Sequence, residues 1–280
     1  MENNVINSHI GKTNQLFSHE IPKLYDRYAV PIFFEGYAED IANRLAPYNP
    51  KVILEIASGT GAVTRALSSK FNSSTKIIAT DINEDMRRYA STTKTKGSIE
   101  WKLADAMDLP FEDETFDAVV CQFGVMFFID KIKGFSEVYR VLKKGGVFIF
   151  NVWGRLSENE FTYVVDESMK GIFRDNPPDF YSRIPFGYHN LKVINEDLVR
   201  SGFNGKIETQ NVEKRSIADS PMDVAISLCE GTPLRNEILS RDKSKLDYSK
   251  QVASKAIERE FGSGRVDGKM KAYVVIAEKT

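Results

Sequence analysis

The first half of the chain alternates short apolar runs with segments whose apolar residues recur at helical spacing. Strands are predicted for the apolar runs at residues 51–57, 76–80, 99–103, 116–122 and 147–153. The intervening segments, at 62–71, after Asn83 and from Ile132 to Leu142, carry apolar residues three or four positions apart, which is typical of helices with one buried face. Apolar strands separated by crossover helices form parallel sheets covered on both faces. The pattern therefore predicts an α/β fold with a doubly wound sheet.

Less regular patterns lie on either side of this region. Two helices are predicted before it, at 22–29 and 34–45, and Pro31 is expected to separate them because proline removes a helical hydrogen bond. Residues 155–194 are rich in aromatic side chains and broken by prolines, and we interpret them as an inserted lid. The other predicted elements are a helix at 195–201, a strand at 206–216, a helical stretch at about 221–261 and a strand at 271–278. Two final strands joined by helices would form an antiparallel edge on the sheet.

The composition excludes several classes of protein. Lys and Arg total 38 and Asp and Glu total 39, for a formal net charge of −1. The chain thus lacks the positive excess with which nucleic-acid binders displace counterions, and no nucleic-acid partner is expected. No apolar stretch approaches the ~18 residues that span a bilayer, and the first residues lack the pattern of a secretory signal. The two cysteines, Cys121 and Cys229, lie in unrelated contexts, which fits a reducing cytoplasm. We therefore expect a cytoplasmic protein without a membrane span.

The strongest chemical signal is the sequence EIASGTG at residues 55–61, where an apolar strand enters a glycine turn and then a helix. A Cβ at Gly59 or Gly61 would occupy the volume of a ligand, so these glycines allow close approach to the backbone. The first N–H groups of the following helix favour an anionic group. Glu55, late in the apolar strand, needs a cationic or hydrogen-bonding partner, such as a ligand's ammonium group or a water. The simpler interpretation is that the glycines only make a tight turn.

Two aspartates follow the next two predicted strands. Asp81 ends the second strand, where a carboxylate can accept hydrogen bonds from both hydroxyls of a ribose. Asp105 follows the third strand, where it can accept from an adenine amino group while Ala106 offers a backbone N–H. Taken singly, Asp81 could cap a helix and Asp105 could be a solvated loop residue. Their coincidence with the glycine turn favours nucleoside binding.

The dinucleotide fingerprint G-x-G-x-x-G is incomplete, because Thr64 stands at its third glycine. This weakens the case for a nicotinamide or flavin cofactor, although the motif tolerates variants. An NAD(P)-dependent oxidoreductase therefore stays open as an alternative.

Five successive motifs resemble those of class I S-adenosylmethionine (SAM)-dependent methyltransferases: VILEIASGTGAVT, IIATDINEDM, LADAMDLPF, FDAVVCQFGVMFF and EVYRVLKKGGVFIF. The resemblance is greatest to the UbiE-like, or type 11, branch and covers about residues 50–153. It implies a Rossmann-like sheet of seven strands in the order 3-2-1-4-5-7-6, with strand 7 antiparallel. It also implies SAM as the cofactor, with S-adenosylhomocysteine (SAH) as its product.

By position, the resemblance assigns a set of residues to the cofactor. These are Glu55, Ala57, Ser58, Gly59, Thr60 and Gly61 for the methionine part, Asp81 and Ile82 for ribose and adenine with Met86 packing nearby, Asp105 and Ala106 for adenine, and Gln122 and Phe123 for the methionine and sulfonium. Ser58 departs from the pattern, since many relatives carry glycine or cysteine there. The implied organisation is an N-terminal helical segment at 1–48 covering the cofactor site, a SAM-binding core at 49–154, a lid or acceptor insertion at 155–194 and a C-terminal completion of the sheet at 195–280.

The expected activity is transfer of a methyl group to a small, partly apolar molecule by in-line displacement, which mainly requires alignment in a dry site. Aromatic faces attract a sulfonium, and Tyr25, Tyr28, Phe33 and Phe123 are candidates that could equally be core residues. The aromatic residues of the lid could wall an acceptor pocket or form the lid's own small core.

Further chemistry depends on the acceptor. An acceptor that loses a proton early would need a general base, for which the candidates are His189 and Tyr28, although a loop histidine is more often a surface residue. No metal is expected, because the histidines and cysteines lack metal-ligand spacing. A non-catalytic SAM-binding protein would carry the same motifs and also stays open.

Overall fold

The computed structural model describes residues 16–17 and 20–280. Of the N-terminal segment expected at residues 1–48, residues 1–15, 18 and 19 therefore lie outside the described residues. His9 and His19 are among them.

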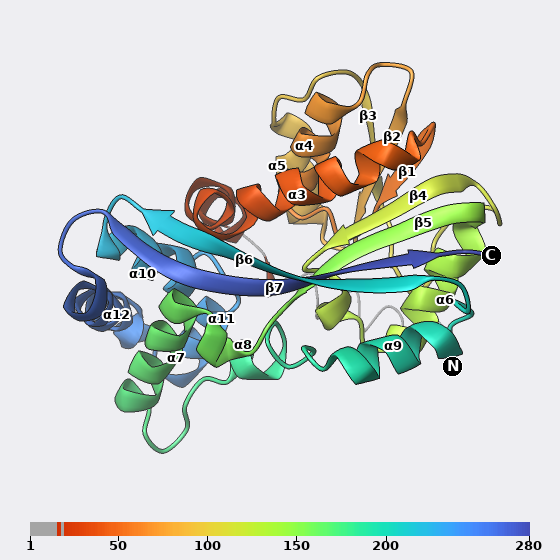
Figure 1. The fold of residues 1–280 in the computed structure, drawn as a ribbon. Coiled ribbons are helices and arrows are strands. Elements are labelled where there is room, and N and C mark those ends of the chain that lie inside the picture. Colours follow the sequence, from red (N-terminus) through yellow and green to blue (C-terminus); the bar gives the residue numbers. More distant parts are fainter. Residues whose placement is uncertain (1–15, 18–19) are drawn as a thin grey trace.

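The fold is built on a seven-stranded sheet in the order β3-β2-β1-β4-β5-β7-β6 (Figure 1). The strands are β1 (Val52–Glu55), β2 (Lys76–Asp81), β3 (Ile99–Leu103), β4 (Phe116–Gln122), β5 (Leu142–Trp153), β6 (Ile207–Ala218) and β7 (Val266–Glu278). β1 to β5 pair in parallel, whereas β7 runs antiparallel between β5 and β6. The expected strand order and the antiparallel seventh strand are confirmed.

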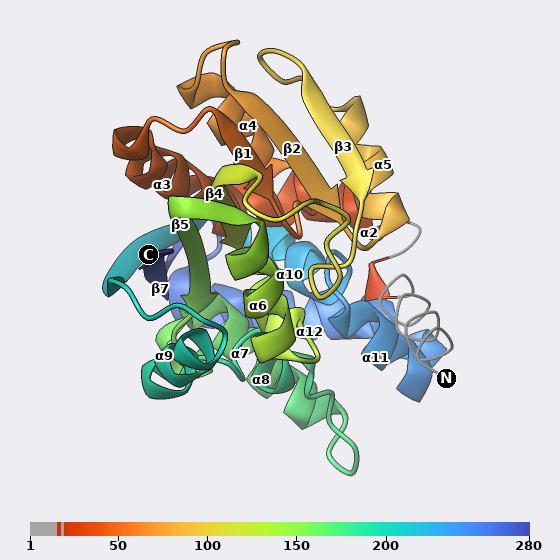
Figure 2. The same ribbon diagram turned by 90° about the vertical axis from the view of Figure 1, so that its right-hand side faces the viewer.

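Helices cover both faces of this sheet (Figures 1 and 2). They are α2 (Ile21–Leu24), α3 (Glu35–Leu45), α4 (Ala62–Lys70), α5 (Glu84–Thr92), α6 (Lys131–Val141), α7 (Glu160–Ile172), α8 (Phe180–Arg183), α9 (Leu191–Arg200), α10 (Pro221–Cys229), α11 (Leu234–Arg241) and α12 (Leu246–Phe261). A π-helix, η1 (Tyr25–Phe34), joins α2 to α3, and short 3₁₀ turns are η2 (Ala46–Tyr48), η3 (Val125–Phe127), η4 (Leu156–Glu158) and η5 (Lys243–Lys245).

The central strands are buried on both faces because each face has its own core. Successive side chains of a strand point to opposite faces, so Val120 joins the core that contains α3 and α4, whereas Val119 joins the core that contains α6. Phe148 of β5 lies in the second core with Phe135 of α6, their ring centroids 5.9 Å apart. This burial explains why the strands read as near-continuous apolar runs.

Pro31 does not separate two helices, contrary to the sequence-based expectation. It lies inside η1, and α2, η1 and α3 follow one another without a break. The N–H of Glu35 bonds to the carbonyl of Val30, five residues earlier, which is the π-helical register. The wider turn accommodates a proline that would clash with the preceding turn of an α-helix. The N-terminal segment therefore stays continuous and presents one face to the ends of the strands.

The lid region at 155–194 contains η4, α7 and α8, and it runs into α9. α9 begins at Leu191, earlier than the predicted 195, because the side chain of Asn190 accepts hydrogen bonds from the N–H groups of Lys192 and Val193. The expected boundary after residue 194 thus falls within a helix. The long helical stretch predicted near 221–261 is divided into α10, α11 and α12, which gather beside α7 and α8 at one end of the molecule (Figures 1 and 2).

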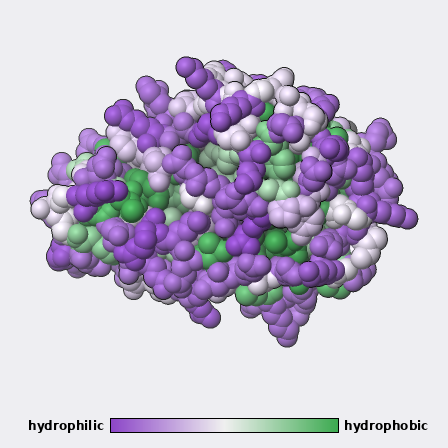
Figure 3. Space-filling model, turned by 45° about the horizontal axis from the view of Figure 1, so that its top comes forward, coloured by the Kyte–Doolittle hydropathy of each residue, from purple (hydrophilic) through white to green (hydrophobic). Residues whose placement is uncertain are grey.

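The surface shown in Figure 3 is mostly hydrophilic, with small and separate hydrophobic patches. Within residues 20–280, no helix has the length and apolar character needed to cross a bilayer.

Candidate active site

A cavity lies at the carboxyl ends of the parallel strands, between the sheet and the helices added to it. Its walls come from η1, from the ends of β1, β2, β4 and β5, and from the loops after β2 and β3. α8, the chain after it and the connection between α10 and α11 complete the enclosure. Ligands of open α/β sheets bind at this edge, outside the carboxyl ends of the strands.

Most of the residues predicted to hold a cofactor line this cavity. They are Tyr25, Phe33, Ala57, Gly59, Asp81, Ile82, Met86, Asp105, Ala106, Gln122 and Phe123. The remaining predicted residues, Glu55, Ser58, Thr60 and Gly61, do not line it. The strand ends thus bring together residues spread over about a hundred positions of the chain.

The turn after β1 has an unusual backbone. Ala57, Gly59 and Gly61 all have positive φ, at 54°, 55° and 87°. A Cβ built on Gly59 would meet no protein atom within 4 Å, so the space beside it is open, as predicted for a close ligand approach. A Cβ on Gly61 would instead lie 3.1 Å from the ring of Trp101. The lack of a side chain at Gly61 therefore makes room for Trp101 of β3, and the ligand role of Gly61 stays a prediction.

Asp81 connects the end of β2 to the glycine turn. One carboxylate oxygen accepts a hydrogen bond from the N–H of Gly59 at 2.7 Å, and the other accepts from the N–H of Asn83 at 2.7 Å. Burial raises the pKa of Asp81 to about 6, although these N–H donors oppose the shift. The N–H of Ile82 is a third donor to this carboxylate, which leaves part of its acceptor capacity for a ligand beside the cavity. Asp81 can therefore accept a hydrogen bond from a hydroxyl of a ligand.

Glu55 lies beneath the turn and not in the cavity. Its carboxylate accepts a hydrogen bond from the hydroxyl of Thr64, with 2.5 Å between the oxygens, and the residue is 2% exposed. Thr64 is thus a hydrogen-bonding partner of the kind that the buried acid was predicted to need, and a contact of Glu55 with the methionine part of SAM stays a prediction. The hydroxyl oxygens of Ser58 and Thr60 are also buried, and neither has a hydrogen-bond partner among the described residues.

We expect Glu55 to make the stability of the protein fall with rising pH. Burial raises its pKa from 4.5 to about 8, so the folded state binds more protons than the unfolded state between these values. The free energy of unfolding then falls as pH rises through this window, since the slope follows the difference in bound protons. In Glu55→Gln the free energy of unfolding should decrease by a few kcal/mol less over this pH range than in the wild type. Denaturant unfolding at several pH values between about 5 and 8 measures it.

The matched control is Glu260→Gln, which changes an exposed glutamate of α12. Equal pH slopes for the wild type and Glu55→Gln would show that Glu55 is ionised in the folded protein at neutral pH.

The loop after β3 carries Asp105, Ala106 and Met107, which all line the cavity. One carboxylate oxygen of Asp105 accepts a hydrogen bond from the N–H of Met107 at 2.9 Å, which holds the side chain toward the loop backbone. The helix after β2 begins as predicted, with the side chain of Asn83 accepting from the N–H of Met86 at 2.9 Å. These two loops form the polar end of the cavity.

The end of β4 forms the middle of the cavity. The Nε2 group of Gln122 donates to the carbonyl oxygen of Phe34 at 3.2 Å, whereas Oε1 is buried and has no hydrogen-bond partner among the described residues. Phe123 has a positive φ of 48°, and its N–H donates to Oδ1 of Asn151 at 2.8 Å. Its ring stacks on Trp153 with centroids 3.7 Å apart. An unpartnered acceptor at this point is suited to a donor group of a ligand.

Aromatic side chains enclose the other end of the cavity. Sequence reasoning named Tyr25, Phe33 and Phe123 singly and the aromatic residues of 155–194 as a group, of which Phe180, Tyr181 and Phe186 line the cavity. Phe180 and Tyr181 also belong to the main core, not to a separate core of that segment, and their role toward an acceptor stays a prediction. The structure adds Phe34, Phe127 and Trp153, which carried no local signal beyond their apolar character.

The candidate bases lie elsewhere. Tyr28 does not line the cavity, and the guanidinium of Arg27 lies over its ring at 5.0 Å. His189 is also absent from the wall, and its Nδ1 is 2.7 Å from the carbonyl oxygen of Phe186. In the part of the chain that the structure describes, no group of three or more His, Cys, Asp and Glu side chains could hold a metal ion.

Comparison with known proteins agrees with this geometry. Residues 54–150 match the family model described as a methyltransferase domain. The chain is 31% identical to the ubiquinone/menaquinone biosynthesis C-methyltransferase UbiE of Hydrogenovibrio crunogenus, over 48% of this chain and 49% of that protein. It is 39% identical to a demethylmenaquinone methyltransferase of Clavibacter sepedonicus, over 36% of this chain and 41% of that protein.

The chain spans about half the length of the curated relatives it matches, and the match to the family model lies in the core of the sheet. A SAM-dependent methyltransferase of Thermotoga maritima has a similar solved structure, with a TM-score of 0.52 and 18% identity over 91% of this chain and 94% of that one, which shows the fold alone. Residues 54–150 of this chain therefore match a methyltransferase domain, and part of the chain is similar in sequence to the UbiE enzymes.

Proposed function

We propose that the whole chain is an enzyme that transfers the methyl group of SAM to a small, largely apolar and uncharged molecule. The observation that carries the proposal is the division of the cavity into two chemically different ends. Asp81 and Asp105 stand at one end, and aromatic rings such as those of Trp153 and Phe180 enclose the other. A polar cofactor and an apolar acceptor would meet between them, beside Gln122 and Phe123.

The residues at the polar end fit SAM. The remaining acceptor capacity of Asp81 suits a ribose hydroxyl, and Asp105 suits the adenine amino group. The buried, unpartnered Oε1 of Gln122 suits the ammonium of the methionine part, and the open space beside Gly59 leaves room for it. When bound, SAM supplies a methyl group on a sulfonium, whose carbon–sulfur bond breaks with its electron pair left on sulfur as the bond to the acceptor forms. The nearby aromatic faces would stabilise the sulfonium charge.

The chain's contribution would be orientation and exclusion of water. No His, Lys, Arg or Glu side chain lines the cavity among the described residues. Burial raises the pKa of Tyr25 and of Tyr181, so both phenols stay protonated at neutral pH. None of these side chains would act as a general base, and the rate enhancement would come from alignment in a dry site.

The acceptor should be uncharged at the atoms that enter the aromatic end. The carboxylates that line the cavity, Asp81 and Asp105, belong to its polar end. Transfer of an ionic group into a site without a partner costs several kcal/mol. The aromatic walls instead favour an apolar body by burial of its surface.

Ligand selectivity tests the proposal directly. In thermal unfolding with SAM, SAH or NADH, we expect SAM and SAH to raise the midpoint by several degrees, because a ligand at about 100 times its dissociation constant stabilises by about 2.7 kcal/mol. NADH should leave the midpoint unchanged. Stabilisation by NADH alone would indicate the oxidoreductase. Binding of SAM without turnover of any member of a broad acceptor panel, scored by mass spectrometry for one added methyl, would indicate a non-catalytic protein.

A further inference from the structure

A buried pair of hydroxyl groups interrupts the aromatic end of the cavity. Tyr181 comes from α8 and Thr232 from the connection between α10 and α11, and both line the cavity. The two hydroxyl oxygens lie 3.1 Å apart. The carbonyl oxygen of Leu228 lies 2.8 Å from that of Tyr181 and 2.7 Å from that of Thr232. Tyr181 is 4% exposed and Thr232 is 8% exposed, so bulk solvent has little access to hydrogen-bond with their hydroxyl groups.

The available protons restrict what this pair can offer to a ligand. Two hydroxyl protons are shared among three oxygens, because Leu228 contributes only an acceptor. Each hydroxyl is placed to donate to the carbonyl oxygen of Leu228, and the N–H of Leu234 also donates to Thr232 at 3.3 Å. With both protons on these bonds, lone pairs remain on the hydroxyl oxygens. In this arrangement the pair accepts a hydrogen bond from a ligand and does not donate one.

We propose that Tyr181 and Thr232 anchor the methyl acceptor by accepting a hydrogen bond from its O–H or N–H group. This inference rests on the proposed function and narrows its substrate class to uncharged molecules with a flat or apolar body and one hydrogen-bond donor. A cationic donor is disfavoured, because the neighbouring carboxylate of Asp166 is ion-paired with Lys170 and does not line the cavity.

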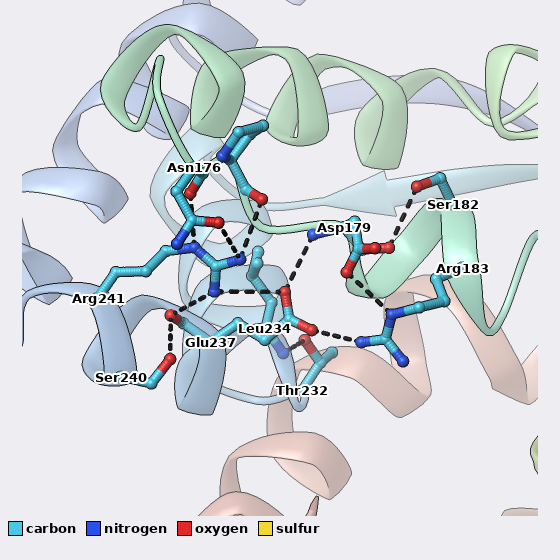
Figure 4. Close-up of polar contacts among 10 residues, drawn as sticks. Asn176, Asp179, Ser182, Arg183, Thr232, Leu234, Glu237, Ser240 and Arg241 are labelled. Carbon is cyan, nitrogen blue, oxygen red and sulfur yellow. Dashed lines mark hydrogen bonds and ion pairs between the residues drawn. The ribbon is translucent and has the colours of Figure 1, made fainter.

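A polar cluster outside the cavity joins residues 176–183 to α11, close to Thr232 (Figure 4). Glu237 of α11 pairs with the guanidinium of Arg183 at 2.6 Å and accepts from the N–H of Asp179 at 3.0 Å. Arg241 donates to the carbonyl oxygens of Asn176 at 2.7 Å and of residue 177 at 3.0 Å. Exposed ion pairs alone contribute little to stability, but Glu237 and Arg241 also form hydrogen bonds with backbone groups.

The cluster joins the stretch that carries Tyr181 to the helix that follows Thr232. Glu237 is therefore a positioning residue for the anchor. Its loss should alter the spacing of the two hydroxyls without touching the polar end of the cavity.

The test compares two fragments of the same shape, indole, which has an N–H donor, and benzofuran, which has none. Protein saturated with SAH is titrated with each by ligand-observed NMR. We expect indole to bind the wild type roughly 3- to 10-fold more tightly than benzofuran, as for one buried hydrogen bond. Tyr181→Phe and Thr232→Val should each reduce this preference toward 1-fold, and Glu237→Gln should reduce it partly. SAH affinity should not change in any of them, which also verifies that each variant is folded.

Ser182→Ala is the matched control, because it removes an exposed hydroxyl next to Tyr181 that does not line the cavity. Equal binding of the two fragments to the wild type, failure of both to bind, or an undiminished preference in Tyr181→Phe would overturn the anchor. Failure of SAH to bind the wild type would instead contradict the proposed function.

Discussion

Asp81→Ala is expected to weaken the binding of SAM and SAH by about 1–3 kcal/mol, or roughly 5- to 150-fold, which isothermal titration calorimetry measures. Two effects combine. The ribose would lose a charged acceptor, and the turn would lose the bond from the N–H of Gly59 that fixes its position beside β2. Asp175→Ala removes an exposed aspartate that does not line the cavity and serves as the control.

The same residue should make cofactor affinity depend on pH. Burial raises the pKa of Asp81 to about 6, and hydroxyl donors of a ligand bind its charged form. As pH falls below about 6, protonation competes with binding, so the affinity of the wild type for SAH should fall by up to about tenfold per pH unit. Asp81→Asn should bind more weakly but with a flatter profile. Parallel profiles, or an unchanged affinity in the alanine variant, would remove Asp81 from the site.

Gly59→Ala is expected mainly to weaken cofactor binding, whereas Gly61→Ala is expected mainly to lower the stability of the fold. A methyl group on Gly59 would enter open space at the cavity wall, so the fold should lose only the roughly 1 kcal/mol of a positive φ for alanine. SAH binding should weaken by about 1–3 kcal/mol, because the methyl group occupies ligand volume. A methyl group on Gly61 would press on Trp101 and Ala90 at 3.1 and 3.4 Å. That variant should lose about 2–4 kcal/mol of stability.

Urea unfolding and SAH titration on the same preparations separate the two effects. Below its unfolding transition, Gly61→Ala should retain most of its affinity, since its Cβ lies away from the cavity. If Gly59→Ala binds SAH as well as the wild type does, the turn does not approach the ligand, and the glycine only makes the turn.

Local patterns sufficed for most of the secondary structure. The strands at β3 and β4 match their predicted bounds, and Asn83 caps α5 as expected. The predicted helix bounds were wrong where a particular contact outweighs the helix propensity of the residues. Pro31 was read as a helix break, but the widened register of η1 accommodates it. The start of α9 was missed because the capping role of Asn190 was not recognised.

The candidate site likewise contains residues that the sequence identified and contacts that only the structure shows. Gly59, Asp81 and Asp105 were identified from the sequence because each lies at the end of a strand or a few residues after it, and parallel strands bring their carboxyl ends to one edge. The sequence did not show that Glu55 accepts a hydrogen bond from Thr64, which the first turn of α4 places beside it, and the predicted ligand contact of Glu55 stays a prediction. No property of the residue types indicates the bond to Thr64 without the packing.

The sequence by itself determined the strands, the helices between them and the acidic and glycine positions at the strand ends, because these follow from periodicity and from the few conformations of the backbone. Only the tertiary structure decided which side chains share the cavity. Two helices and a strand separate Tyr181 from Thr232 in the chain, but their hydroxyl oxygens lie 3.1 Å apart. His189 and Tyr28, by contrast, do not line the cavity. The reason is that contacts between distant segments depend on how the added helices pack on the sheet, and that packing depends on the shapes of many side chains together.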